Sequence, residues 1–325
     1  MQLLITGGAG YIGSHMVKYA QDNNCEVVVI DNMSTGHKHS IKDCELINVN
    51  LVNEEGLSKC LKGRKFDGVI HFAGKSLVGE SMQSPEKYYK NNVVGSLNLV
   101  NNLIKNDINN IVFSSTAAIF GNPVMNKIAE CHPKKPINPY GKTKLIVEEI
   151  LKDYSLSFGL NATCFRYFNA AGADFSGQIG EEHEPETHLI PNIFKSILSN
   201  KNNLKIYGND YDTPDGTCIR DYVHVNDLAQ AHLLGLKKMT NYSGFFEYNL
   251  GNSKGFSILN ILDECKKISG KEISYEVASR REGDPAILVA DSTKAIKELG
   301  WKPKYDDIKL ILKSAWNWHK KHYSF

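Results

Sequence analysis

Hydrophobic residues in the first half of the chain occur in short unbroken runs, separated by longer segments with helical periodicity. Apolar, largely β-branched runs of this length are typical of strands buried on both faces of a parallel sheet. They occupy residues 2–6, 26–30, 45–49, 68–73, 111–115 and 162–168. The helix-compatible segments between them are 11–22, 54–62, 85–106 and 140–157, and Asn53 is a plausible N-cap for the second. This alternation predicts an α/β fold with a doubly wound parallel sheet and right-handed crossovers.

The pattern loosens after Asn169, and the change predicts a second, smaller domain. Residues 170–188 are rich in Gly, Glu, Pro and His and are predicted to be a loop, followed by a helix at 189–199 and by more loop. A helical segment at 224–239 and an apolar run at 246–251 are expected to return to the first sheet. The predicted division is a first domain of residues 1–168 plus about 222–251, and an interleaved α/β domain of about 169–221 and 252–325.

The composition excludes several classes of protein. Of the 325 residues 42% are hydrophobic and 23% are charged, with a formal net charge of +2, so a large core is expected and no basic face for nucleic acid. No apolar run approaches the ~20 residues of a membrane span, and no signal peptide precedes the first predicted strand. Seven cysteines without a CxxC pair indicate reduced thiols in the cytoplasm, and no metal site is expected.

A glycine-rich stretch, LLITGGAGYIGSH, follows the first strand directly and opens the first helix. Gly7, Gly10 and Gly13 permit a tight turn, close approach of the backbone to a pyrophosphate, and tight packing of the helix on its strand. The free amides at the helix N-terminus then face the anion. The second strand ends at Asp31, at about the spacing where a carboxylate accepts hydrogen bonds from the ribose hydroxyls and repels a 2′-phosphate. The predicted cofactor is therefore NAD rather than NADP.

Tyr140 and Lys144, in the stretch NPYGKTK, lie four residues apart at the start of a predicted helix and share one of its faces. Thr116 ends the fifth strand, and ligands bind at the carboxyl ends of strands in such sheets. A tyrosine hydroxyl, with an ordinary pKa of about 10, needs nearby positive charge to act as a base near neutrality. We therefore interpret Tyr140 as the acid–base catalyst, with Lys144 and the oxidised, positively charged nicotinamide both lowering its pKa and Thr116 bonding the reacting sugar oxygen.

Motifs spread over nearly the whole chain resemble, in order, those of the UDP-glucose 4-epimerase family of extended short-chain dehydrogenases/reductases. They are TGGAGYIGSH, VIHFAG, YYKNNVVGS, FSSTAAIFG, PYGKTK, RYFNAAGA, GNDYDTPDGTCIRDYVHV and RREGDPA. The resemblance implies a Rossmann sheet and an isomerase that keeps NAD bound through turnover. It implies that Tyr140 as phenolate takes the proton of the sugar 4-hydroxyl while hydride passes from C4 to NAD⁺, and that the keto sugar rotates before the hydride returns. It also implies a homodimer that serves galactose metabolism.

The resemblance also assigns ligand contacts. Residues implied to bind the cofactor are Tyr11, Ile12, Asp31, Asn32, Thr35, Gly36, Asn50, Leu51, Phe72, Ala73, Gly74, Asn91, Lys144 and Phe168. Residues implied to bind the UDP-sugar are Thr116, Tyr140, Asn169, His188, Leu189, Lys205, Ile206, Tyr207, Arg220, Arg281 and Asp284. The arginines suit this role, because a planar guanidinium binds a diphosphate in bidentate fashion.

Four positions differ among members of the family. Asn50 stands where many have an Asp that receives the adenine amino group, Ser76 where some have a Lys, and His188 where others have Asn. Leu288 aligns with a position beside the sugar, where members restricted to plain hexoses tend to carry Tyr. Because a large ring there would overpack against a 2-acetamido group, at ~1–3 kcal/mol, Leu288 predicts additional activity on UDP-GlcNAc and UDP-GalNAc.

Alternative functions differ in the residues that they need. A sugar 4,6-dehydratase needs an acid and a base beside the keto sugar, and Ala117 and Ala118, which follow Thr116, cannot transfer protons. An NAD-dependent UDP-uronic acid epimerase or decarboxylase stays open, because only pocket residues separate it. A non-catalytic NAD-binding module predicts the loss of Tyr140, Lys144 or Thr116, and all three are present.

Overall fold

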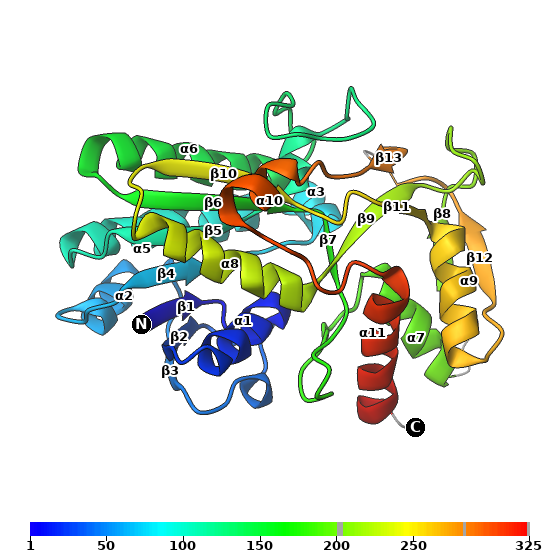
Figure 1. Ribbon diagram of the computed structural model, residues 1–325, viewed down its shortest axis with the longest axis horizontal. Helices are drawn as coiled ribbons and strands as arrows, with labels where there is room; N and C mark the ends of the chain where they lie inside the picture. Colours follow the sequence, from blue (N-terminus) through cyan, green and yellow to red (C-terminus); the bar gives the residue numbers. More distant parts are fainter. Residues whose placement is uncertain (200–203, 282–283, 324–325) are drawn as a thin grey trace.

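The computed structural model describes residues 1–199, 204–281 and 284–323. Its main element is a parallel seven-stranded sheet (Figure 1). The strands are β1 Gln2–Thr6, β2 Glu26–Asp31, β3 Glu45–Asn48, β4 Gly68–His71, β5 Asn110–Thr116, β6 Asn161–Tyr167 and β10 Phe245–Leu250. Their order, β10-β6-β5-β4-β1-β2-β3, reverses direction between β1 and β4, which is the switch point where such sheets bind ligands. The predicted doubly wound parallel sheet is confirmed.

Helices cover both faces of this sheet, and the strands explain why. Leu3 and Ile5 of β1 belong to a core shared with α1 and α8, whereas Leu4 between them belongs to a core on the opposite face, shared with α2, α5 and α6. Every residue of the apolar run is thus buried, so no polar alternation interrupts it. The covering helices are α1 Tyr11–Asp22, α2 Glu54–Leu61, α5 Gly95–Lys105, α6 Pro139–Phe158 and α8 Val225–Met239.

The single helix predicted over 85–106 consists of three segments. They are α4 Pro85–Tyr88, the π-helical η2 Tyr89–Val94, and α5. A π-turn inserts one residue into a continuous apolar pattern, so periodicity alone does not reveal it. A short helix, α3 Val78–Gln83, precedes this region and was not predicted. Two 3-10 turns, η1 Lys38–Ser40 and η3 Ala117–Phe120, follow β2 and β5.

A smaller unit lies beside the sheet, around a third apolar core contributed mainly by α7, α9 and α11 (Figure 1). Its elements are β7 Asn169–Ala171, α7 Leu189–Ser199, β8 Leu204–Tyr207, β9 Ile219–His224, β11 Gly255–Ser257, α9 Ile258–Ser269, β12 Tyr275–Ala278, β13 Ile287–Leu288 and α11 Ile308–His322. The prediction of loop after α7 was wrong for β8, which is short, has polar neighbours in sequence and pairs with the distant β12. The first two residues of the loop predicted at 170–188 likewise belong to β7.

The C-terminal part of the chain returns to the large sheet before it ends. Helix α10 Thr293–Leu299 packs on α8 and β10, and Trp301 is fully buried, its indole donating to the carbonyl of Asp227 at 3.0 Å. The predicted division into two domains therefore stays a proposal, in which α10 connects the small unit to the large sheet. No helix in the described part of the chain has both the length and the apolar character of a membrane span. All seven cysteines are free thiols.

Candidate active site

The glycine turn between β1 and α1 is compact for steric reasons. Gly7 has a φ of 71°, and a Cβ there would lie 2.5 Å from the amide nitrogen of Ala73; a Cβ on Gly13 would lie 2.1 Å from the Gly7 oxygen. Gly10 differs, because the nearest protein atom to its Cβ position, also the Gly7 oxygen, is 3.5 Å away. Gly10 caps α1 without a side-chain hydrogen bond to the first amides of the helix. The turn therefore leaves space for an anion and leaves the first backbone N–H groups of α1 free to donate to it, as a dinucleotide cofactor requires.

Asp31 ends β2 beside this turn and is 8% exposed. Its Oδ2 accepts from the amide of Ala9 at 3.0 Å and its Oδ1 from that of Met33 at 2.9 Å. A carboxylate has further lone pairs, so these two bonds hold it in place while leaving capacity for ribose hydroxyls. The residues present therefore fit NAD, and Asp31 has a structural role that its spacing alone did not reveal.

The other predicted cofactor residues follow the carboxyl ends of the strands, which is where the fold places ligands. By position, they are Asn32, Thr35 and Gly36 after β2, Asn50 and Leu51 after β3, Phe72, Ala73 and Gly74 after β4, Asn91 in η2 and Phe168 after β6, with Tyr11 and Ile12 at the start of α1. The Tyr11 hydroxyl donates to the carbonyl of Gly172 at 2.6 Å, so only its ring and backbone face the turn freely. Asn50 Oδ1 accepts from the Val52 amide at 3.0 Å, which uses one lone pair of this oxygen and leaves the other for the adenine amino group.

Tyr140 is the second residue of α6, and the start of this helix is pressed against η3. Asn138 caps the helix by accepting from the Gly141 amide at 2.8 Å, and Pro139 occupies its first position. A Cβ on Gly141 would lie 2.5 Å from the carbonyl oxygen of Ala118, so glycine is needed for this approach. The approach buries the Tyr140 hydroxyl, which raises its pKa, and brings it within hydrogen-bond reach of the Thr116 side chain, which offsets part of this rise. The side chains of Thr116 and Tyr140 therefore lie next to each other, and their shared role at the sugar oxygen stays a proposal.

Thr116 is oriented by its own backbone. Its Oγ1 accepts from the amide of Ala118 at 3.1 Å, as a strand-end hydroxyl commonly does, and the side chain is 9% exposed. Because the oxygen is already an acceptor, the hydroxyl proton stays available to a substrate oxygen or to Tyr140. The ring of Tyr88, which is fully buried, lies edge-on to the Tyr140 ring at 6.5 Å and restricts its orientation.

Lys144 is 4% exposed, and its Nζ donates to the carbonyl oxygen of Ser114 at 2.8 Å. It also lies 4.8 Å from the centre of the Phe113 ring. Burial lowers the pKa of Lys144 to about 8. Burial also raises the pKa of Tyr140 above its ordinary value, and the hydrogen bond from Thr116 offsets this only in part. In the protein without cofactor, desolvation of the phenolate outweighs the bond from Thr116, so the lowering of the Tyr140 pKa by Lys144 together with an oxidised nicotinamide stays a prediction for the cofactor-bound site.

Sequence reasoning missed two polar residues that support the site. Asn92 is 2% exposed; its side chain accepts from the Lys75 amide at 2.7 Å and donates to the Lys75 carbonyl and to Thr143 Oγ1, each at 3.0 Å. It thereby ties the loop after β4 to α6. Tyr167 hydrogen-bonds the hydroxyl of Ser114 within the sheet. The sequence has two adjacent asparagines, Asn91 and Asn92, in this segment. The π-helical turn η2 decides that Asn92 is the buried one, and the sequence pattern does not reveal this turn.

The predicted substrate residues form two groups on the small unit. Arg220 is 8% exposed; its guanidinium donates to Asp284 Oδ1 and to the Pro285 carbonyl, each at 2.8 Å. Arg281 lies over the Tyr207 ring, 4.0 Å from its centre. These contacts hold both guanidinium groups between β8, β9 and the segment before β13. Arg220 already has a carboxylate partner, Asp284, so a bound diphosphate would have to share Arg220 with Asp284 or displace Asp284.

Other members of the predicted set are placed less favourably. Ile206 is 3% exposed within the third core, so its side chain is not free to contact a ligand, and only its backbone could. Lys205 is exposed, and Asn169 donates to the carbonyl of Asp221 at 2.9 Å. Leu288 pairs in register with Arg220 and packs on the small cluster that begins at Ala117, directly after Thr116. This position suits the predicted contact of Leu288 with the sugar.

His188 and Leu189 stand where the loop enters α7. His188 Nδ1 lies 2.7 Å from a carboxylate oxygen of Glu181, and the imidazole is 48% exposed. The nearby carboxylates of Glu181 and Glu186 raise the pKa of His188 to about 10. Without a metal ion in this cluster, His188 is therefore a cation at neutral pH, which favours contact with an anionic substrate more than the Asn found in other members would.

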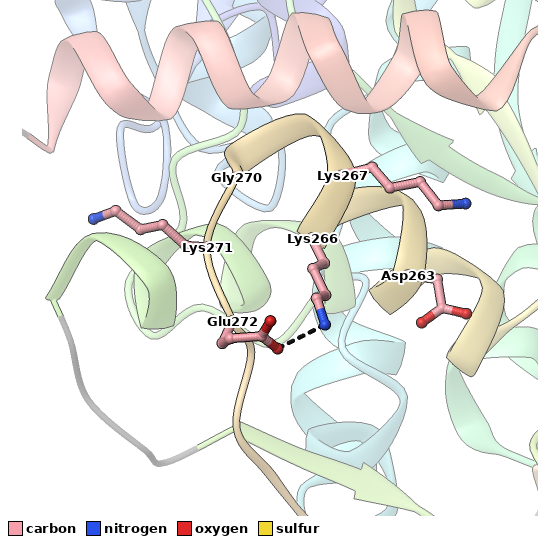
Figure 2. A pocket seen from close by; sticks show the side chains of 6 residues that line it. All are labelled: Asp263, Lys266, Lys267, Gly270, Lys271 and Glu272. Atoms are coloured by element: carbon pink, nitrogen blue, oxygen red, sulfur yellow. Dashed lines mark ion pairs between the residues drawn. The ribbon is translucent and has the colours of Figure 1, made fainter.

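A separate hollow lies at the C-terminal end of α9 (Figure 2). Its lining is Asp263, Lys266, Lys267, Gly270, Lys271 and Glu272. Figure 2 shows the Lys266 ammonium directed at Glu272, at 2.7 Å, and both side chains are at least half exposed. Exposed, flexible ion pairs of this kind do not constitute a built ligand site.

Comparisons with known proteins agree with this geometry. A family model described as GDP-mannose 4,6 dehydratase matches residues 4–313. The UDP-glucose 4-epimerase of Halalkalibacterium halodurans is 45% identical over 322 residues, 99% of this chain and 96% of that protein. The crystal structure of UDP-glucose 4-epimerase from Brucella ovis in complex with NAD is 40% identical with a TM-score of 0.94, covering 99% of this chain and 98% of that one. The UDP-Glc/GlcNAc 4-epimerase from Campylobacter jejuni is 40% identical with a TM-score of 0.84, covering 98% and 99%. The chain therefore belongs to the UDP-glucose 4-epimerase family of extended short-chain dehydrogenases/reductases.

Proposed function

We propose that this protein catalyses the reversible 4-epimerisation of UDP-glucose and UDP-galactose with tightly bound NAD. The observation that carries the proposal is the placement of Thr116, Tyr140 and Lys144 together at the strand ends, beside a glycine turn that fits a dinucleotide. The names of full-length relatives support the choice of substrate. A dehydratase reaction is disfavoured, because Ala117 and Ala118 provide no acid or base where one would be needed.

Epimerisation requires oxidation of carbon 4 to a ketone and reduction from the opposite face. NAD, when bound, supplies the hydride acceptor and donor for these two halves. Tyr140 removes the proton of the 4-hydroxyl in the first half and returns a proton in the second. Thr116 donates a hydrogen bond to the same oxygen, and Lys144 supplies positive charge beside the phenolate. Since there is no net change of oxidation state, the cofactor has no need to leave between turnovers.

The decisive test is to incubate the purified protein with UDP-glucose, without added cofactor, and to measure UDP-galactose by chromatography. Formation of UDP-galactose supports the proposal. UDP-glucuronic acid and UDP-galacturonic acid are tested in parallel, because a UDP-uronic acid epimerase shares the fold and the catalytic residues. If only the UDP-uronic acids are converted, the proposed 4-epimerisation is retained but its substrate is a UDP-uronic acid. Conversion of neither pair, in protein that has retained NAD, would reject the proposal.

Asp31 predicts that NAD copurifies with the protein and that NADP does not replace it. A second negative charge beside this buried carboxylate is expected to cost several kcal/mol, equivalent to at least about 100-fold in affinity. Activity is measured after removal of the nucleotide and reconstitution with NAD or NADP. The Asp31→Asn variant keeps one carbonyl oxygen as an acceptor but loses the negative charge, so it is expected to prefer NAD over NADP less strongly. Equal reconstitution of the wild type by both cofactors would place Asp31 away from the ribose.

Leu288 predicts activity toward UDP-GlcNAc in addition to UDP-glucose. We expect Leu288→Tyr to lower kcat/KM for UDP-GlcNAc by about 10–100-fold relative to UDP-glucose, because the ring would occupy volume swept by the acetamido group. Leu288→Met changes the shape with little change in volume and is the matched control. The rate of each variant is measured on both substrates. A wild type inert toward UDP-GlcNAc, or a Tyr variant with an unchanged ratio, would show that the selectivity is set elsewhere.

The protein is also proposed to be a homodimer that associates through α5 and α6. Tyr89 and Val94, just before α5, and Ile146 on α6 are 36–43% exposed, as apolar side chains at an interface would be in the isolated chain. We expect Val94→Lys to weaken dimerisation at least about tenfold, measured by sedimentation velocity. Leu310→Lys, at a similarly exposed position on α11, should leave the dimer intact. A monomeric wild type contradicts the proposal.

A further inference from the structure

Four metal-ligating side chains gather in the segment between β7 and α7. They are Glu181, His183, Glu186 and His188, and each offers one ligand atom that lies within 4.8 Å of the others. All come from one stretch of eight residues, EEHEPETH, which the sequence predicted only as a loop. The backbone of this segment, and not a helix or strand, therefore brings the four side chains together.

Two separations between ligand atoms, both from His183, match the edges of a tetrahedral metal site, and His188 would have to shift to complete it. His183 Nδ1 lies 3.5 Å from Glu181 Oε1 and 3.6 Å from Glu186 Oε2. His188 Nδ1 lies 3.4 Å from the other Glu186 oxygen, Oε1, which already accepts from two backbone amides. Ligands bound at about 2.0–2.2 Å from Zn²⁺ with tetrahedral angles are about 3.3–3.6 Å apart. The contact between His188 and Glu181, at 2.7 Å, is a hydrogen bond and would have to open by about 0.6 Å to reach this spacing.

Buried polar atoms in the cluster lack hydrogen-bond partners. The side chains of Glu181 and Glu186 are 6% and 3% exposed. Glu186 Oε1 accepts from the amides of Thr187 and His188 at 2.8 and 2.9 Å, but Oε2 has no hydrogen bond among the described residues. His183 Nδ1 has none either, since distances of 3.5 and 3.6 Å are too long. Burial of a carboxylate oxygen without a donor is unfavourable unless a cation meets it.

We propose that Glu181, His183, Glu186 and His188 bind a divalent transition-metal ion, with Zn²⁺ the best match. Imidazole nitrogens and carboxylate oxygens are ligands that Zn²⁺ accepts at these distances, and the two carboxylates balance its charge. His188, 48% exposed, lies at the open side and provides a path of entry. The expectation of no metal site rested on the cysteines, and this cluster contains none.

Protons on the two histidines are the competing way to balance the buried carboxylates. Glu181 and Glu186 raise the pKa of His183 to about 9, so an ion-paired network without metal is chemically reasonable. The two states differ in a measurable way, because only the metal site requires all four ligands at once. The segment also contacts the large unit, since His37 and His39 hydrogen-bond Glu182. A bound ion would therefore stabilise the junction that leads into α7.

The test is calorimetric titration of ZnCl₂ into full-length protein, with any affinity tag removed and metals extracted with EDTA. We expect one tight equivalent in the wild type and a loss of more than about 100-fold in affinity in His183→Gln, which removes a ligand and keeps similar volume. His39→Gln is the matched control, because it removes a histidine from the adjacent group formed by His37, His39 and Glu182. That variant should bind Zn²⁺ as the wild type does.

A second readout keeps the result independent of folding defects and of enzyme activity. Co²⁺-loaded wild type should show the visible bands of a tetrahedral complex, and Glu186→Gln and His183→Gln should lose them while their circular dichroism stays native. Absence of saturable Zn²⁺ binding at micromolar concentration overturns the proposal. So does equal binding by wild type and His183→Gln, or a loss that follows His39→Gln instead.

Discussion

Tyr140→Phe is expected to reduce kcat by about 10²–10⁴-fold while NAD and UDP binding survive. The substitution removes the phenol oxygen, the atom proposed to exchange a proton with the 4-hydroxyl. The ring itself is retained, so its edge-on contact with Tyr88 and the start of α6 should be unchanged. The rate is measured as conversion of UDP-galactose to UDP-glucose, and nucleotide binding as bound NAD per chain and the Kd of UDP.

Tyr154→Phe is the matched control for this variant. It removes a phenol oxygen from the same helix, where that oxygen donates to Asn101 Oδ1 on the neighbouring α5 and has no contact with the site. We expect kcat within about twofold of the wild type, since a single hydrogen bond of ~1 kcal/mol affects stability rather than proton transfer. A loss below about tenfold in Tyr140→Phe would assign the proton transfer to another group, with Thr116 the first candidate.

The large sheet could be predicted because burial on both faces removes any ambiguity of pattern. Leu3, Leu4 and Ile5 are all fully buried, so their run is unbroken and cannot be mistaken for an amphipathic helix of similar length. Strands of the small unit lack this signal. β8 and β12 pair with each other across about seventy residues of sequence, and Tyr275 and Val277 of β12 are 43% and 50% exposed. Short, exposed strands whose partner is distant leave too few residues for a pattern to be recognised.

Residue types and spacing predicted which residues form the catalytic site, but they did not predict the pKa shifts of these residues. The four-residue spacing of Tyr140 and Lys144 places both on one face of α6, and the helical Gly141 between them permits the close approach to Ala118. The depth of burial has no such local signal, and burial decides the direction of both pKa shifts. The cluster of Glu181, His183 and their neighbours was missed for a related reason. A loop sequence gives no periodicity from which to infer which side chains converge.

Beneath the site, Glu148 of α6 forms a buried ion pair with Arg166 of β6, and both side chains are at most 1% exposed. Arg166 Nε donates to Glu148 Oε1 at 2.9 Å, and the Ser115 hydroxyl donates to the same oxygen at 2.5 Å. Arg166 also contacts Glu247, which Lys134 reaches at 3.0 Å. The pair thus joins α6, which carries the catalytic tyrosine, to β5 and β6 at the ends where ligands bind.

We expect Glu148→Ala to lower the free energy of unfolding by about 3–5 kcal/mol, because it leaves the Arg166 guanidinium buried with a single carboxylate partner. The measurement is urea unfolding at fixed protein and NAD concentration, since bound nucleotide and subunit association also contribute to stability. Glu55→Ala, which breaks the exposed pair with Lys59, is the control and should leave the midpoint unchanged.

The double variant Glu148→Leu with Arg166→Met separates the value of the ion pair from the cost of breaking it. Removing both charges eliminates the unpaired guanidinium, so we expect this variant to recover most of the stability lost in Glu148→Ala. Glu247 is 24% exposed and keeps Lys134 as a partner, so it should tolerate the change. A double variant no more stable than Glu148→Ala would mean that the charged network itself stabilises the fold. A loss below about 1 kcal/mol in Glu148→Ala would mean that water or Glu247 replaces the missing carboxylate at little cost.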